Sequence, residues 1–93
     1  YVLQDADDRF WIAIHSRTER GGVGSGSVSL VGMLPDGFKE IFAITGATHF
    51  TKGKDAYSTA LALDDRQTSV IAIAEGTYQG RTVEERRVIA LPR

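Results

Sequence analysis

The sequence contains no cysteine, which excludes a disulfide framework and any metal site built on thiolates. No purely apolar run is longer than five residues, whereas a transmembrane helix needs roughly 20. An excess of one charge is also missing, because 11 basic residues are interleaved with 12 acidic ones. Since nucleic-acid-binding domains usually carry a clustered basic excess, we expect no nucleic-acid partner. The lack of cysteine does not fix the compartment, although we favour an extracellular or cell-surface location.

Sequence motifs that would identify a chemistry are equally scarce. The glycine-rich segment 21–27 lacks the Lys-Ser or Lys-Thr pair of a P-loop, and Ser25 is not flanked by the glycines of a nucleophile elbow. The acidic segment 5–8 departs from the EF-hand pattern. His15 and His49 are the only histidines, and their separation matches no metal-ligand signature. We therefore expect no metal, no cofactor and no catalytic residue, with a hydrolase that uses His15 or His49 as a further alternative.

What the sequence does contain is a regular series of short β-type runs, spaced about ten residues apart and separated by Gly, Pro or Asp. The clearest runs are residues 10–14, 28–31, 38–44, 57–63 and 70–74. This spacing predicts one all-β domain over residues 1–93, an antiparallel two-sheet sandwich of immunoglobulin-like size without the cysteine pair. A small closed β-barrel that holds an apolar small molecule is the alternative.

Two segments in the first half of the chain have opposite turn chemistry. Pro35-Asp36-Gly37 predicts a hairpin between strands at 28–33 and 38–45, because proline fixes φ and glycine accepts a positive φ. Segment 21–27 is rich in glycine and serine and therefore predicts a flexible loop. Gly46 is expected to end or kink the strand that follows the hairpin.

The last third of the chain admits two interpretations. A three-residue loop at 79–81 would pair odd-numbered residues with one another and set Glu75 opposite Glu85. This hairpin is preferred over a two-residue loop because it gathers five apolar side chains on one face: Ile71, Ile73, Val83, Ile89 and Leu91. A helix over residues 83–91 is the alternative, since the segment begins with a capping-box pattern. The 79–81 tip and segment 21–27 are expected to be mobile, and one of them to border the binding surface.

Alternation within the strands predicts which side chains are buried. The expected core consists of Phe10, Ile12, Ile14, Leu30, Phe42, Ile44, Leu61, Ile71, Ile73 and Ile89. Trp11 alternates with Phe10 and Ile12 and so points away from them. It is either an exposed recognition residue or a side chain buried by a second sheet, and burial is favoured because tryptophan is highly buried on average.

By elimination, the sequence predicts a non-catalytic binding or assembly module. We expect one domain of a larger surface, secreted or phage-type protein, which presents loops or a sheet face to a protein or glycan partner. Aromatic residues at a surface often mark recognition sites. Trp11, His49 and Tyr78 are therefore the expected ligand-binding residues.

Overall fold

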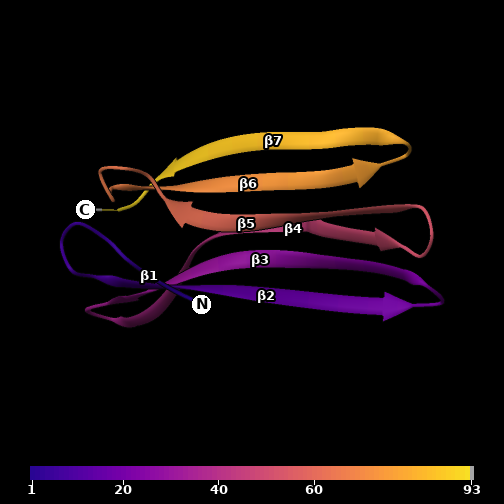
Figure 1. Cartoon of the computed structure of the whole chain (residues 1–93). Helices are drawn as coiled ribbons and strands as arrows, with labels where there is room; N and C mark the ends of the chain where they lie inside the picture. Colours follow the sequence, from indigo (N-terminus) through magenta and orange to yellow (C-terminus); the bar gives the residue numbers. More distant parts are fainter. Residues whose placement is uncertain (93) are drawn as a thin grey trace.

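A computed structural model describes residues 1–92 of the chain as an all-β fold, with 76% of them in strands. The seven strands are β1 (Val2–Gln4), β2 (Phe10–Arg20), β3 (Val23–Leu34), β4 (Gly37–Thr51), β5 (Asp55–Leu63), β6 (Ser69–Tyr78) and β7 (Arg81–Ala90). They form a single antiparallel sheet in which each strand pairs with its neighbours in the sequence (Figure 1). Among the described residues, no helix is long and apolar enough to cross a membrane.

The predicted all-β class is confirmed, but the closed-barrel alternative is wrong. The first and last strands, β1 and β7, are the two edges of an open sheet and do not pair with each other. The predicted division into two separate sheets is not confirmed either, since all seven strands belong to one hydrogen-bonded sheet. The C-terminal helix is also wrong, because β7 occupies that segment.

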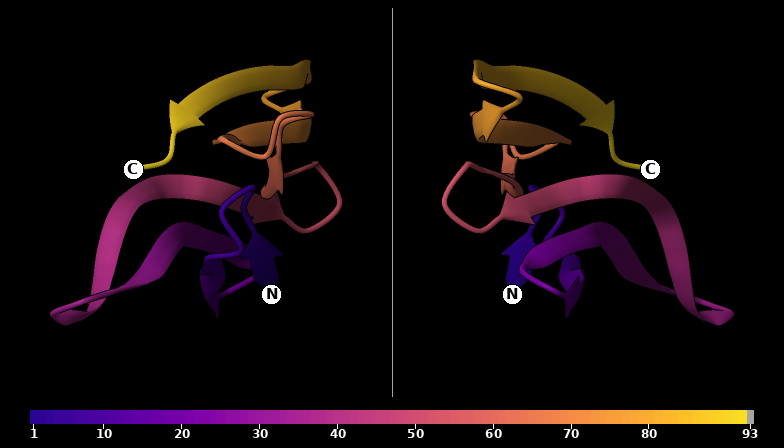
Figure 2. Two further views of the ribbon diagram at one scale, coloured as in Figure 1. Left: turned by 90° about the vertical axis from the view of Figure 1, so that its left-hand side faces the viewer. Right: turned by 90° about the vertical axis from the view of Figure 1, so that its right-hand side faces the viewer.

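The sheet nevertheless has a weak point between β4 and β5. Only three residue pairs join these strands, His49–Tyr57, Phe50–Ala56 and Thr51–Asp55. β4 is also irregular against β3, with register shifts between Gly26 and Val28 and between Leu30 and Val31. Bulges of this kind bend a strand, and Figure 2 shows the long curve of β4. Gly46 lies within the first bulge at a φ of +66°, so the predicted kink is confirmed.

The hydrophobic core joins β1–β4 to β5–β7. Its buried members are Trp11, Ala13, Val28, Leu30, Ala47, Leu61, Val70, Ala72 and Leu91. A polar contact fastens the same two parts of the sheet together. The Tyr1 hydroxyl donates to the Leu61 carbonyl at 2.8 Å and accepts the Leu61 amide at 2.6 Å. This contact satisfies backbone groups of β5 at a level where β4 no longer pairs with it.

The predicted core is correct for β3, β4 and β5 and wrong for β2. It is also wrong for β6, where Val70 and Ala72 belong to the core cluster and Ile71 and Ile73 do not. Leu30, Leu61 and Ile71 are buried, and Phe42 and Ile44 pack against the core. Ile12, Ile73 and Ile89 are only partly buried. Phe10 and Ile14 are exposed by 59% and 47%. Trp11 and Ala13 occupy the core instead, so the face of β2 that we predicted to be buried is the outer one.

Gly32 explains the reversal in β2. It pairs with Trp11, and a Cβ atom at this position would collide with the indole ring. The absence of a side chain on Gly32 therefore leaves room for the largest side chain of the protein on the core side of the sheet. Trp11 is 1% exposed there, which confirms the burial favoured from its type.

Two predicted loops are also wrong. The 21–27 segment is mostly strand, since only Gly21 and Gly22 form the turn and β3 pairs with β2 from Val23 onward. The last hairpin has a two-residue turn, in which Gln79 and Gly80 have φ values of +51° and +74°. Two positive φ values suit the right-handed twist of the flanking strands. This turn sets Glu75 opposite Glu84, so odd-numbered residues of β6 pair with even-numbered residues of β7.

Candidate functional site

The most distinctive surface of the molecule is an apolar patch on the sheet face opposite the core. We call it the β1–β4 outer face and define it by Val2, Phe10, Ile12, Ile14, Val31, Met33 and Phe38. Pairing across the strands places these residues side by side. Val2 pairs with Ile12, which pairs with Val31. Met33 pairs with Phe38 on β4. On its other side, the Gly32–Trp11 pair sets the register between β3 and β2, so the next position along each strand brings Met33 level with Phe10.

The side chains of this face are exposed to an extent unusual for their type. Phe38 is 65% exposed, Phe10 and Val2 are 59% exposed, and Met33 is 58% exposed. Glu40, the partner of Val31, carries the only charge at the paired positions of the patch. A single exposed apolar residue needs no explanation, but a contiguous group of this kind makes the face a candidate interaction surface.

The same face becomes polar toward the other end of β2 and β3. Ser16 pairs with Ser27 and Thr18 pairs with Ser25, so hydroxyl groups replace the apolar side chains. The boundary shows that the apolar residues are gathered at one end of the face.

A second candidate site is an aromatic cluster of His49, Tyr57 and Tyr78. The His49 ring stacks on Tyr57 at a centroid distance of 5.8 Å, and Tyr78 meets both rings edge-on, at 5.0 Å from His49 and 5.8 Å from Tyr57. The Tyr57 hydroxyl donates to the Gly46 carbonyl at 2.9 Å. His49 Nε2 lies 2.9 Å from the Thr51 hydroxyl. The structure thus brings together two of the three residues predicted to bind a ligand.

Tyr57 completes this cluster and was missed from the sequence. Alternation in β5 already places Tyr57 on the bulky face of its strand, but only the pairing of β4, β5 and β6 sets it against the other two rings. The rings pack mainly against one another, and Tyr78 is 41% exposed. The geometry is that of a mutually stabilising aromatic group, with the Tyr78 ring as its most accessible part.

Trp11, the third predicted binding residue, lies in the core and has no exposed ring surface. Its indole Nε1–H donates to Asp5 Oδ2 at 2.9 Å. The Asp5 carboxylate also accepts the backbone amides of Asp7 and Arg9, at 2.8 and 3.0 Å, and Arg9 Nε at 2.9 Å. Trp11 and Asp5 therefore hold the β1–β2 turn against the core.

The hydrogen bonds around Asp5 determine its charge state. Burial raises the pKa of Asp5, but the hydrogen bonds from Trp11, Arg9 and Asp7 and the positive charge of Arg9 outweigh that effect. The net result is a pKa below the ordinary aspartate value. Asp5 is thus a charged group, only 4% exposed, whose oxygens are fully used by neighbouring donors.

Each of the two histidine rings lies against a tyrosine ring. The His15 ring lies 5.5 Å from the Tyr1 ring, and His49 belongs to the aromatic cluster. No hydrogen bond in the described part of the chain connects either ring to a carboxylate. Within residues 1–92, no three His, Asp or Glu side chains converge as metal ligands would.

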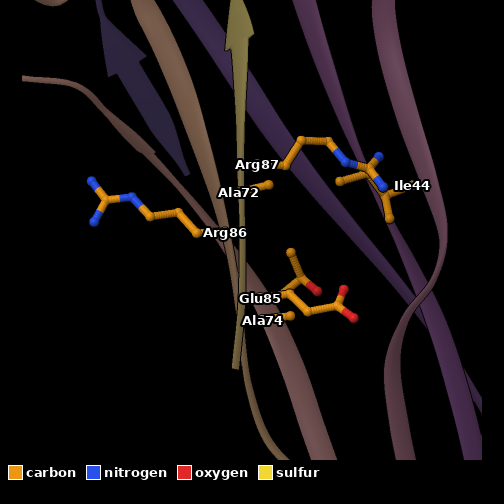
Figure 3. A pocket seen from close by; sticks show the side chains of 7 residues that line it. Ile44, Ala72, Ala74, Glu85, Arg86 and Arg87 are labelled. Carbon is orange, nitrogen blue, oxygen red and sulfur yellow. The ribbon is translucent and has the colours of Figure 1, made fainter. Parts of the chain in front are cut away.

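A cleft of about 270 Å³ opens between β4 and the β6–β7 hairpin. Ile44, Thr59, Ala72 and Ala74 form its wall, and Glu85 and Arg87 of β7 lie at its mouth. Figure 3 shows the Glu85 and Arg87 side chains directed to the cleft side of β7, whereas Arg86 points the other way. The alanines do leave space, but the space is open and bordered by charges instead of being an enclosed apolar cavity.

Comparisons with known proteins do not extend these observations, because no protein-family model, curated protein or solved structure matches the chain. The functional argument therefore depends on the surfaces of the chain itself.

Proposed function

We propose that this chain is a non-catalytic binding or assembly module that presents its β1–β4 outer face to a protein partner. The observation that carries the proposal is the level row of Phe10, Met33 and Phe38, all more than half exposed on one sheet face. These side chains are not needed in the core, which is complete on the other side of the same strands. Their burial would become favourable only when another surface covers them.

The composition of the face favours a protein over a glycan as the partner. The buried centres of protein interfaces are rich in aromatic residues and methionine and poor in charged residues. The β1–β4 outer face has two phenylalanines and a methionine, with Glu40 as the single charge at its paired positions. A glycan would need several hydrogen-bonding groups next to the rings, whereas only Gln4 pairs with Phe10 and most of the hydroxyl-bearing residues lie at the other end of the face.

The scaffold supports this role because it holds the face in place before binding. β3 pairs along most of its length with both β2 and β4, and β1 pairs with the Phe10 end of β2 at three positions, so the backbone under the face is fixed. A rigid sheet needs little ordering on association, which leaves more of the apolar burial available for affinity. A partner sheet on this face would also supply the second layer of the sandwich that the strand pattern suggests.

Photo-cross-linking in the native source tests the proposal. A photoreactive phenylalanine analogue replaces Phe38 in one variant and Val88, which is 63% exposed on β7, in the control. We expect a protein adduct from position 38 and none from position 88, with the adduct identified by mass spectrometry. Equal adducts from both positions, or none from position 38, would contradict the proposal.

A further inference from the structure

We infer that the partner on the β1–β4 outer face is a second copy of this chain, so that two sheets stack face to face around a two-fold axis. The inference rests on the proposed function and specifies its partner. Most soluble oligomers are symmetric dimers in which the same patch is used on both copies. A flat apolar sheet face is a natural patch of this kind, since two sheets can stack about 10 Å apart with their side chains interdigitating.

The size of the face agrees with this partner. Five of its side chains are exposed by 47–65%: Val2, Phe10, Ile14, Met33 and Phe38. With large side chains offering on the order of 150–250 Å² each, they present roughly 600 Å² per copy. Two copies would bury roughly 1,200 Å², which is the lower limit for specific and stable interfaces. The partly buried Ile12 and Val31 lie within the patch and add to this area.

The strand pairing makes the face self-complementary. β3 lies between β2 and β4, so a two-fold axis along β3 exchanges those two strands between the copies. Phe10 on β2 of each copy then lies over Phe38 on β4 of the other, because both residues are level with Met33. The two Met33 side chains meet at the axis. Aromatic pairs around a flexible methionine are typical of well-packed interfaces.

The charges around the face are compatible with self-association and do not favour a lipid surface. Glu40 is level with Ile12 and so lies over Ile12 of the other copy. Because β5 does not cover β4 at that level, the Glu40 side chain can extend past the edge of β4 and keep its carboxylate in water. Surfaces that bind anionic membranes carry lysine and arginine around their apolar residues. No basic residue lies at the paired positions of the β1–β4 outer face.

Sedimentation equilibrium of the purified chain tests the inference. The matched variants are Phe38→Glu and Val88→Glu, since Val88 is 63% exposed on β7 and both changes add one negative charge. At roughly 100 µM, well above the micromolar Kd of weak interfaces, we expect a dimer for the wild type and for Val88→Glu. Phe38→Glu should weaken the dimer by at least roughly tenfold, as for other interface anchors.

A single introduced cysteine locates the contact, because the chain has no other thiol. Met33→Cys should give a covalent dimer with a bis-maleimide whose reach matches the roughly 10 Å spacing of stacked sheets. Val88→Cys, exposed on β7 and away from this face, should react without forming the dimer. Circular dichroism of each variant confirms that its sheet is intact.

The outcomes separate this inference from the proposed function. A wild type that is monomeric at roughly 100 µM overturns the inference, and so does a dimer that Phe38→Glu and Val88→Glu weaken equally. If the wild type is monomeric but position 38 still photo-cross-links to a different protein, the inference fails and the proposed function stands. Binding of the wild type, but not Phe38→Glu, to phosphatidylcholine vesicles with no protein adduct at position 38 would overturn both.

Discussion

Replacing Asp5 with asparagine should destabilise the fold far more than any change at the acidic residues next to it. The Asp5 carboxylate accepts four hydrogen bonds, two of which come from the side chains of Trp11 and Arg9 and end on Oδ2. An asparagine can keep a carbonyl oxygen at Oδ1 but places an NH₂ donor opposite these two donors. Since the indole N–H is buried, losing its acceptor and the charge of Asp5 should cost about 3 kcal/mol.

Urea unfolding followed by tryptophan fluorescence measures this effect directly. With a slope of roughly 1–1.5 kcal/mol per molar urea, Asp5→Asn should unfold about 2–3 M earlier than the wild type. Asp7→Asn is the matched control, because the Asp7 side chain is 75% exposed and lies 3.7 Å from Arg9. It should change the stability by less than about 0.5 kcal/mol.

The pH dependence provides an independent test of the same network. Because the pKa of Asp5 is lower in the folded state than in the unfolded state, its contribution is fully present above the unfolded value of about 3.9. That contribution is lost as the pH falls from there through the lower folded value. Asp5→Asn should therefore show a smaller loss of stability than the wild type at acidic pH. Equal urea midpoints, or equal acid dependence, would refute the account of Asp5 as a charged and saturated acceptor.

Two further predictions test the faces of β2 and β3. Leu30→Ala should lower the free energy of unfolding, measured by urea titration, by about 2–5 kcal/mol. Ile14→Ala should lower it by less than about 1 kcal/mol, because Ile14 is 47% exposed. Similar losses for the two variants would mean that the core lies on both faces. Gly32→Ala should lower the melting temperature by more than 10 °C, because its Cβ would collide with Trp11 and overpacking of this kind costs about 1–3 kcal/mol or more. The control Ser29→Ala, on the same strand, should change the melting temperature by under about 3 °C. An unchanged melting temperature for Gly32→Ala would show that Trp11 does not fill the space beside Gly32.

The sequence contains enough information for the strands but not for their faces. The Pro35-Asp36 turn and the kink at Gly46 follow from local backbone chemistry, and both are confirmed. In β2, five consecutive apolar residues leave alternation without a polar face to orient it. Two residues outside β2 determine which of its faces is buried. Gly32 leaves room for the Trp11 ring, and Asp5 accepts a hydrogen bond from the Trp11 indole.

The candidate site was hidden by the same ambiguity. Phe10 and Ile14 were assigned to the core, although they belong to the exposed β1–β4 outer face. The predicted register of the last hairpin is wrong for a related reason. Grouping apolar residues on one face favoured a three-residue loop, whereas the backbone adopts the two-residue turn that matches the twist of the strands. His49 and Tyr78 could be chosen from their residue types, but their contact with each other and with Tyr57 depends on pairing across three strands.

The central claim is that association covers the β1–β4 outer face, and ¹⁹F NMR of the chain labelled with fluorophenylalanine tests it most directly. The four phenylalanines are a built-in comparison, since Phe10 and Phe38 lie on this face while Phe42 packs against the core and Phe50 lies under Arg17. Spectra are recorded as the chain associates, through increasing concentration or through addition of the cross-linked partner. We predict that the Phe10 and Phe38 signals shift together while those of Phe42 and Phe50 stay in place. Shifts confined to Phe42 or Phe50, with Phe10 and Phe38 unchanged, would contradict the account.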